Sequence, residues 1–417
     1  MSETASILHL FEAIGIELEY MIVDRETLDV RPFADRVLVD GSGEPALEIE
    51  LGDIAWSNEL VLHVLEMKTN GPARTLDGWT QRFDESVRRA DAMLEKQGCR
   101  LLPSGMHPWM DPHRDAALWP HEQNDIYRAY DRIFGTGGHG WVNLQSTHVN
   151  LPFCGDEEFV RLHAAIRAVL PLLPALAASS PFVEGKRTGI LDNRLEFYRN
   201  NQRRVPSIAG GVIPDPVGSQ DEYQERILKT IYRDIAPFDP EGILQYEWLN
   251  SRGAIARFDR RAIEIRLLDI QESPRADLAV IAAVVAAVRA LTEERWARID
   301  DLQKIPSDTL RSLWLEAIRL GGQAHVADRG VLSAFGLFGE NDRSMREVWQ
   351  HLISTLVDPL QAAREGWDAF YSCLLKEGTL ADRLLAATDV SDDRASIKRV
   401  YKRLANVLRR GEIFHAS

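Results

Sequence analysis

The alternation of apolar and acidic side chains in residues 15–24, GIELEYMIVD, constrains the fold more than any other feature of the sequence. A period of two is typical of a β-strand, and it places Ile16 and Leu18 on one face and Glu17 and Glu19 on the other. The two carboxylates are then about 6–7 Å apart. Neighbouring carboxylates repel each other, so this strand predicts a cation between them, such as a hard divalent metal ion. The alternative is the solvated outer face of an edge strand.

Three later segments repeat this alternation, with side chains suited to binding metals or phosphates on one face. These side chains are Glu66 and Lys68 in VLHVLEMKT, Ser146, His148 and Asn150 in STHVN, and Glu264 and Arg266 in AIEIRLLDI. A face that was merely solvated would show Thr, Ser, Lys and Gln at random. The four segments together favour an antiparallel sheet with one polar face that forms the floor of a site.

Glu59 is a further candidate, although its spacing from Glu66 does not fit a single strand. Seven residues separate the two, so an uninterrupted strand would turn them to opposite faces, and a bulge or a different element must intervene if both face one site. The candidates then comprise five carboxylates and His148, which is more than one divalent ion needs. Two or three Mg²⁺ or Mn²⁺ ions fit this donor set, and arginines nearby would hold phosphate oxygens, as in phosphoryl transfer. No Walker loop, kinase glycine loop or dinucleotide fingerprint occurs in the sequence.

The bulk properties exclude several classes of partner. The net charge of −14 argues against a nucleic acid or an anionic membrane as the main partner. The three cysteines are far apart, which indicates a reducing compartment and no thiolate metal site. The N-terminus does not resemble a secretory signal, and the longest apolar run, residues 278–288, is too short to span a bilayer. We expect a soluble cytoplasmic protein, and association into a homo-oligomer stays open.

The order of the expected elements predicts an α+β fold in one domain over residues 1–417. The sheet-rich part covers about residues 12–272, with a further strand expected over residues 244–249 and a hairpin over residues 254–270. The helical part covers about residues 275–417. Helices are expected over residues 76–97, 124–134, 156–178 (kinked or divided by Pro171 and Pro174), 223–234, 277–300, 307–321, 344–358, 359–374 and 395–410.

Six segments, in order along the chain, resemble those of a known family. They are GIELEYMIVD, ELVLHVLEMKTNGP, SGMHPW, STHVNLP, SSPFVEGKRTG followed by Asn193 and Arg194, and ARFDRRAIEIRLLDIQ. The chain is similar to the glutamate–cysteine ligase family, in particular to the bacterial type 2 carboxylate–amine ligases, whose fold is like that of glutamine synthetase. The resemblance covers about residues 12–290. SGMHPW and SSPFVEGKRTG are the most specific of the six segments.

This resemblance implies a fold, an activity and a set of residue roles. It implies a curved antiparallel sheet that forms the active-site floor, with helices packed outside it, and an enzyme that uses ATP and Mg²⁺ or Mn²⁺. ATP would phosphorylate the side-chain carboxylate of glutamate, and an amine would attack the acyl phosphate. The positions that match the family's metal ligands are Glu17, Glu19, Glu59, Glu66, His148 and Glu264. Arg266 and Glu264 match catalytic positions, Arg257 and Arg266 are assigned to the cofactor, and Arg194 and Asn150 to the substrate.

The chain departs from the family near the expected amino-acid pockets. Many type 2 members carry His-Val-His where this chain has His148-Val149-Asn150, and Met106 replaces a threonine in the segment before His107. The amine acceptor therefore stays open, as does glutamate as the donor. Two alternatives are a phosphoryl transfer like that of guanidino kinases, which share this sheet architecture, and a non-catalytic ligand-binding descendant of such a ligase.

Overall fold

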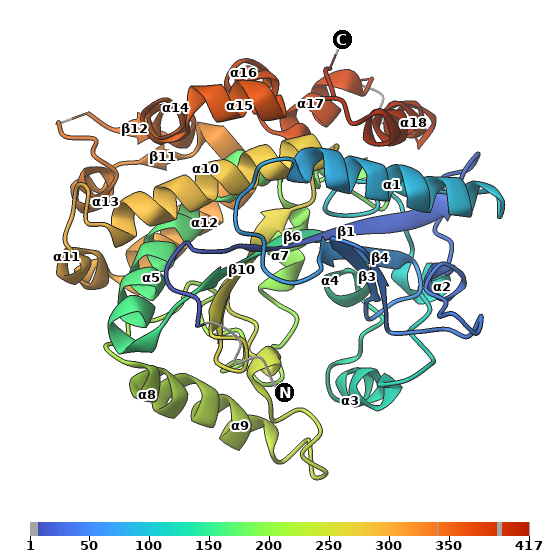
Figure 1. The fold of residues 1–417 in the computed structure, drawn as a ribbon, viewed down its shortest axis with the longest axis horizontal. Coiled ribbons are helices and arrows are strands. Elements are labelled where there is room, and N and C mark those ends of the chain that lie inside the picture. The colour runs from blue at the N-terminus through green and yellow to red at the C-terminus, as the bar shows by residue number, and fades with distance from the viewer. Residues whose placement is uncertain (1–6, 340, 390–393, 417) are drawn as a thin grey trace.

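The acidic strands meet in one antiparallel sheet, as Figure 1 shows for the computed structural model, which describes residues 7–339, 341–389 and 394–416. Along the sheet the strands follow the order β2, β3, β4, β1, β6, β10, β9, and β5 pairs with the far half of β1. Their bounds are β1 Gly15–Asp24, β2 Glu48–Leu51, β3 Ile54–Asn58, β4 Val64–Thr69, β5 Cys99–Leu102, β6 Ser146–Pro152, β9 Ala254–Arg257 and β10 Ala262–Asp269. The predicted antiparallel sheet and the predicted α+β class are both confirmed.

The register of the sheet brings the polar side chains of neighbouring strands side by side. In β1, Glu17 lies between Lys68 of β4 and His148 of β6, and Glu19 lies opposite Glu66. Side chains directly opposite one another in an antiparallel pair have Cβ atoms about 4.5–5.5 Å apart. The alternation read from the sequence therefore gathers charged groups on one face of the sheet.

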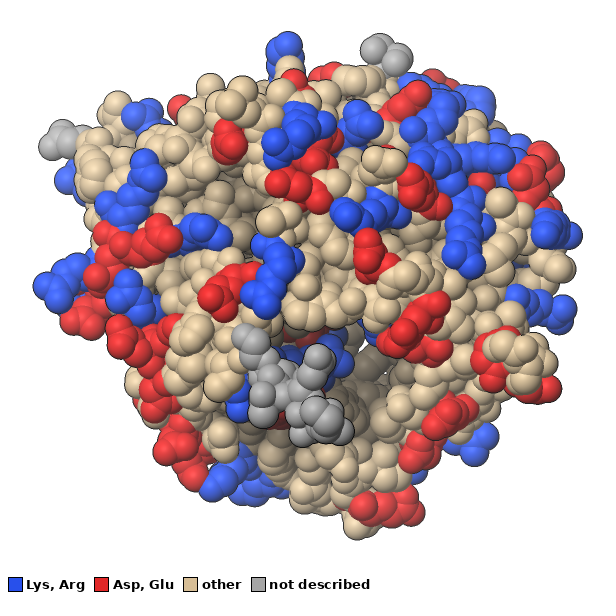
Figure 2. Space-filling model, viewed as in Figure 1, with Lys and Arg blue, Asp and Glu red and all other residues tan. Residues whose placement is uncertain are grey.

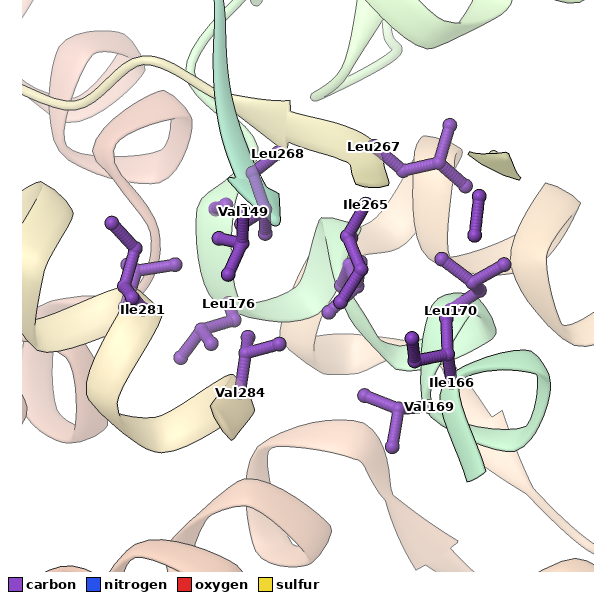
Figure 3. Packing of buried hydrophobic residues seen from close by; sticks show 14 of the residues in the cluster. Val149, Ile166, Val169, Leu170, Leu176, Ile265, Leu267, Leu268, Ile281 and Val284 are labelled. Carbon is purple, nitrogen blue, oxygen red and sulfur yellow. The ribbon is translucent and has the colours of Figure 1, made fainter. Parts of the chain in front are cut away.

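The other face of the sheet is covered by helices and carries the main core. The helices α1 (Trp79–Glu95), α5 (Gly155–Val169) and α10 (Pro274–Thr292) belong to this cover, and α10 packs against both of the others. Figure 3 shows side chains of β6 and β10, such as Val149 and Ile265, facing Ile166 of α5 and Val284 of α10. All four side chains are buried. The apolar half of each alternating strand is thus packed in this core.

The helices α14 to α18 form an outer layer beyond α10 (Figure 1). The remaining helices are α2 Pro112–Asp115, α3 Asn124–Phe134, α4 His139–Val142, α6 Pro174–Ala177, α7 Asn193–Tyr198, α8 Gln220–Tyr223, α9 Lys229–Ile235, α11 Ile299–Lys304, α12 Ser307–Leu320, α13 Arg329–Ala334, α14 Met345–Leu356, α15 Pro359–Glu365, α16 Trp367–Glu377, α17 Leu380–Ala387 and α18 Arg394–Arg410. Short 3₁₀ or π segments are η1 Ala34–Arg36, η2 Leu170–Leu172, η3 Gln224–Leu228, η4 Glu247–Leu249 and η5 Gly321–Gln323. Two small hairpins pair β7 (Phe182–Val183) with β8 (Lys186–Arg187) and β11 (His325–Val326) with β12 (Arg343–Ser344).

The helix expected over residues 156–178 is divided as its prolines predict. α5 ends at Val169, and Pro171 lies in η2 and Pro174 begins α6. The strand expected over residues 244–249 is wrong. The carboxylate of Asp239 accepts the backbone N–H groups of Ile243 and Leu244, at 3.1 and 2.8 Å, and the chain turns into η4 instead of pairing with a strand. Within the described residues, no helix is both long and apolar enough to cross a membrane.

Candidate active site

His148 stands at the centre of the acidic face and is shared by two groups of potential metal ligands. One group comprises Glu17, His148 and Glu264, and the other comprises Glu19, Glu66 and His148. Within each group the donor atoms lie within 4.8 Å of one another. The imidazole Nδ1 is 3.0 Å from Glu17 Oε2, and Nε2 is 2.9 Å from the hydroxyl of Ser146. Carboxylate oxygens with one imidazole form a donor set that suits Mg²⁺ or Mn²⁺.

The pKa values of these carboxyls diverge because the acids are crowded. Burial and the charge of Glu17 raise the pKa of Glu66 to about 7. Burial and the charges of Glu19 and Glu66 raise the pKa of Glu59 well above its usual range. Burial acts in the same direction on Glu17, but the hydrogen bond with His148 and the charge of its imidazole outweigh burial and lower the pKa of Glu17 to about 2. Glu59 and Glu66 are therefore crowded by like charge, and bound divalent ions would relieve this repulsion.

Two arginines lie beside the acid cluster and share one carboxylate. Arg266 Nε is 3.1 Å and Arg257 Nη1 is 3.2 Å from the oxygens of Glu264. The register of β10 shifts between Ile265 and Leu268, so Arg266 sits in an irregular stretch, where its backbone N–H donates to the carbonyl of Gly253. Bulges re-aim side chains next to active sites. Nε of Arg257 is buried and has no hydrogen-bond partner among the described residues, which leaves it available to a bound anion.

Arg194 reaches the end of β10 through a buried ion pair. Its Nε donates to Asp269 Oδ1 at 2.7 Å, and Nη2 donates to the carbonyls of Arg266 and Leu268 at 3.0 and 2.7 Å. Nη1 takes part in none of these bonds. Arg194 is thus held rigidly, and one nitrogen of its guanidinium is free of these contacts.

Segments of the most specific sequence motifs surround the same carboxylate. Asp269 is fully buried and accepts the N–H of Ser179 at 2.9 Å and the hydroxyl of Ser180 at 2.8 Å. A Cβ atom at Gly105 would come within 2.4 Å of the Asp269 carboxyl, so only glycine fits there. The serines of SSPFVEGKRTG and the glycine of SGMHPW therefore anchor the end of β10 and do not line the acidic face.

The acidic face opens into two hollows on either side of His148. The first, of about 350 Å³, lies at the Gly15 end of β1, and its lining includes Glu17, Lys68, Asn150 and Arg260. The second, of about 180 Å³, lies toward Glu19 and has Glu59, His148, Arg194 and Arg266 in its lining. Figure 2 shows the molecule hollowed below its centre, on the side of the sheet away from α1 and α10. Asn150 and Arg194, both assigned to the substrate, thus lie in different hollows.

Comparison with known proteins assigns the chain to a family. Residues 13–402 match the model of glutamate–cysteine ligase family 2. The chain belongs to this family. An uncharacterized protein of Archaeoglobus fulgidus is 38% identical over 308 residues, which are 74% of this chain and 80% of that protein. A candidate glutamate–cysteine ligase 2-1 of Nocardioides sp. is 30% identical over 291 residues, 68% of this chain and 69% of that protein.

A solved structure shares the fold of this family 2 chain. It is glutamate–cysteine ligase from Francisella tularensis in complex with AMP, with a TM-score of 0.58, 12% sequence identity and coverage of 95% of this chain and 89% of that one. The glutamine synthetase-like α+β fold that the resemblance implied is confirmed. So are the predicted family and the class of enzyme, a carbon–nitrogen ligase.

The residues predicted for the site of this family 2 chain lie close together. The sequence left open how Glu59 could reach the same face as Glu66. Glu59 reaches the site from the loop between β3 and β4, so a different element intervenes, not a bulge. Most residues in the wall of the second hollow were not predicted from the sequence. Its members include Tyr130, Trp141, Tyr198, Gln202 and Trp248. They come from α3, α4, α7 with the turn after it, and η4, and no spacing in the sequence links these segments.

Proposed function

We propose that this protein is an ATP-dependent carboxylate–amine ligase that activates the side-chain carboxylate of glutamate as an acyl phosphate and transfers the acyl group to an amine. The observation that carries the proposal is the pair of ligand groups that share His148, placed between two hollows and beside two arginines. Phosphoryl transfer depends on positioning and on neutralising charge, and this arrangement supplies both.

Each group of ligands would hold one Mg²⁺ or Mn²⁺ ion. Glu17 and Glu264 would hold the first ion, and Glu19 and Glu66 the second. His148 would be a ligand of one of the two ions, because a neutral imidazole has a single nitrogen with a free lone pair. These ions, when bound, neutralise charge on the phosphate oxygens and on the donor carboxylate. Glu59 lines the second hollow together with Glu19, and it is our candidate for a further metal-ligand position. The raised pKa values of Glu59 and Glu66 support this assignment, since both carboxyls are crowded by like charge.

We assign ATP to the first hollow and the donor to the second. The first hollow has the larger volume and combines apolar side chains with Lys68 and Arg260, which suits a base and its phosphates. The use of ATP is supported by the AMP bound to the Francisella tularensis ligase, which has the same fold. In the second hollow, Arg194 would hold the far carboxylate of glutamate through Nη1.

The reaction would run between the hollows in two steps. An oxygen of the donor carboxylate attacks the γ-phosphorus, and the bond from phosphorus to the leaving ADP oxygen breaks. The amine nitrogen then attacks the acyl carbon, the carbon–oxygen bond to phosphate breaks, and the proton of the new amide nitrogen leaves with phosphate or solvent. Arg266 would contact the transferring phosphoryl group and Arg257 the cofactor, because both guanidinium groups lie beside Glu264 at the junction.

Trapping with hydroxylamine tests this proposal. The protein is incubated with ATP, Mg²⁺, hydroxylamine and a panel of carboxylates led by glutamate, and ADP, phosphate and hydroxamate are measured. We expect one hydroxamate and one phosphate per ADP. ADP without free phosphate would point to a kinase-like transfer, and no ADP with any carboxylate would contradict the proposal. A cytoplasmic location, a single domain and the state of association remain predictions.

A further inference from the structure

An aromatic wall on one side of the second hollow bears on the open identity of the amine. It consists of Tyr130 from α3, Trp141 from α4 and Trp248 from η4. The ring centroids of Tyr130 and Trp141 are 5.3 Å apart, and those of Tyr130 and Trp248 are 6.1 Å apart. Each of the three side chains is only half-buried and lines the hollow.

Neighbouring rings and one hydrogen bond support the wall. Phe134 stacks on Trp141 with ring centroids 5.5 Å apart and planes inclined by 27°. Tyr246 stacks on Trp248 at 5.7 Å with planes inclined by 11°. Asn201 donates a hydrogen bond to the carbonyl of Gly140, which joins α4 to the turn after α7. Rigid aromatic side chains bind flat groups with little loss of side-chain entropy.

A buried hydrogen-bond acceptor without a partner also lines this hollow. Gln202 is 4% exposed, and its Nε2 donates to the hydroxyl of Ser251 at 2.9 Å. Its Oε1 has no hydrogen-bond partner among the described residues. A buried acceptor left unpaired is costly, so a donor N–H of a bound molecule would satisfy it.

We propose that the second hollow binds a primary amine that carries a flat apolar group, in other words that the acceptor belongs to the arylalkylamines and not to small thiol or aliphatic amino acids. This inference rests on the ligase function proposed above and deepens it. The flat group would lie against Tyr130, Trp141 and Trp248, and an N–H of the amine would donate to Gln202. Arg194, in the same lining, would hold the donor, so the amine would occupy only the aromatic side of this hollow.

Competition between amines tests the inference in the full-length protein. With ATP, Mg²⁺ and a donor that gives hydroxamate, we expect kcat/KM for 2-phenylethylamine to exceed that for cysteine and for ammonia by at least tenfold. Trp248→Ala should reduce the ratio of kcat/KM for 2-phenylethylamine to that for ammonia at least tenfold, mainly through KM. Trp248→Phe keeps a flat apolar surface and should retain most of the ratio.

Trp79→Ala is the matched control, because Trp79 is a half-buried tryptophan on α1, which covers the opposite face of the sheet. It should leave the ratio unchanged. A preference for cysteine, or a ratio that is the same in Trp248→Ala and in the parent protein, would overturn the inference. So would selectivity for an arylalkyl carboxylate as donor without any preference among amines.

Calorimetry with 2-phenylethylamine alone separates this inference from the ligase proposal. Saturable binding that is retained in Trp79→Ala and lost in Trp248→Ala supports the amine site, whatever the result of hydroxylamine trapping. Hydroxamate formation without such binding or preference would leave the ligase standing and overturn the amine class. Absence of both hydroxamate and binding would overturn the two proposals together.

Discussion

Replacing Glu66 with glutamine should stabilise the metal-free protein and weaken its response to Mg²⁺ at the same time. Glu66 is buried, and its pKa is raised from 4.5 to about 7 by burial and by the charge of Glu17. A rise of about 2.5 pH units, at about 1.4 kcal/mol each, means that the ionised carboxylate costs about 3 kcal/mol of folding free energy. The cost is absent below about pH 4.5 and complete above about pH 7, because the folded state holds the proton more tightly. The neutral amide does not carry this cost.

The assay is thermal unfolding at pH 8, with EDTA and then with Mg²⁺. For a chain of 417 residues, about 3 kcal/mol corresponds to a rise in Tm of roughly 3–4 °C in Glu66→Gln without metal. Mg²⁺ at 100 times its Kd stabilises the parent by about 2.7 kcal/mol per site, and the variant should lose the contribution of the site that contains Glu66. Glu50→Gln, on the exposed edge strand β2 of the same sheet, is the control and should change neither value. A metal-free variant no more stable than its parent, or with a full response to Mg²⁺, would refute the reasoning.

Three further substitutions test other parts of the account. Arg266→Lys keeps the charge but loses the two-pronged hold on phosphate, so kcat should fall at least tenfold while Tm stays within about 2 °C of the parent. A full rate in this variant would show that the two-pronged hold is not needed. Burial raises the pKa of Asp84 to about 6, so Asp84→Asn should raise the free energy of unfolding at pH 7.5 by up to about 3 kcal/mol and give little gain near pH 4, as urea unfolding would measure. Burial lowers the pKa of His163 to about 3, so His163 takes up a proton in the unfolded state before it does in the folded state. The free energy of unfolding of the parent should therefore fall by about 2 kcal/mol between pH 7 and pH 5. His163→Phe should abolish that part of the pH dependence in urea unfolding.

The sheet could be read from the sequence because burial acts on every second residue of its strands. Ile16 and Leu18 are fully buried, whereas Glu17 between them faces the site. Local spacing is enough to find such a strand, and the register then follows from matching polar faces. The same rule failed at residues 244–249, where Asp239 satisfies the backbone N–H groups that a strand would have offered to a neighbour.

The site was predictable only where its residues lie on strands with one polar face. Glu59 lies in a loop, and its spacing alone gave no direction for its side chain. The partner of Arg194 is Asp269, 75 residues away, and no pattern in the sequence joins them. Trp141 and Trp248 meet through Tyr130 only after three separate helical segments pack together. Tertiary packing thus built the part of the hollow that bears on the amine.

The central claim, that this acidic face activates a carboxylate by phosphorylation, is tested most directly by isotope transfer. The donor is labelled with ¹⁸O in the reacting carboxylate, and the phosphate released during ligation is analysed by mass spectrometry. Attack of the carboxylate on the γ-phosphorus predicts one ¹⁸O atom in each released phosphate. Unlabelled phosphate, formed together with the amide product, would contradict the mechanism.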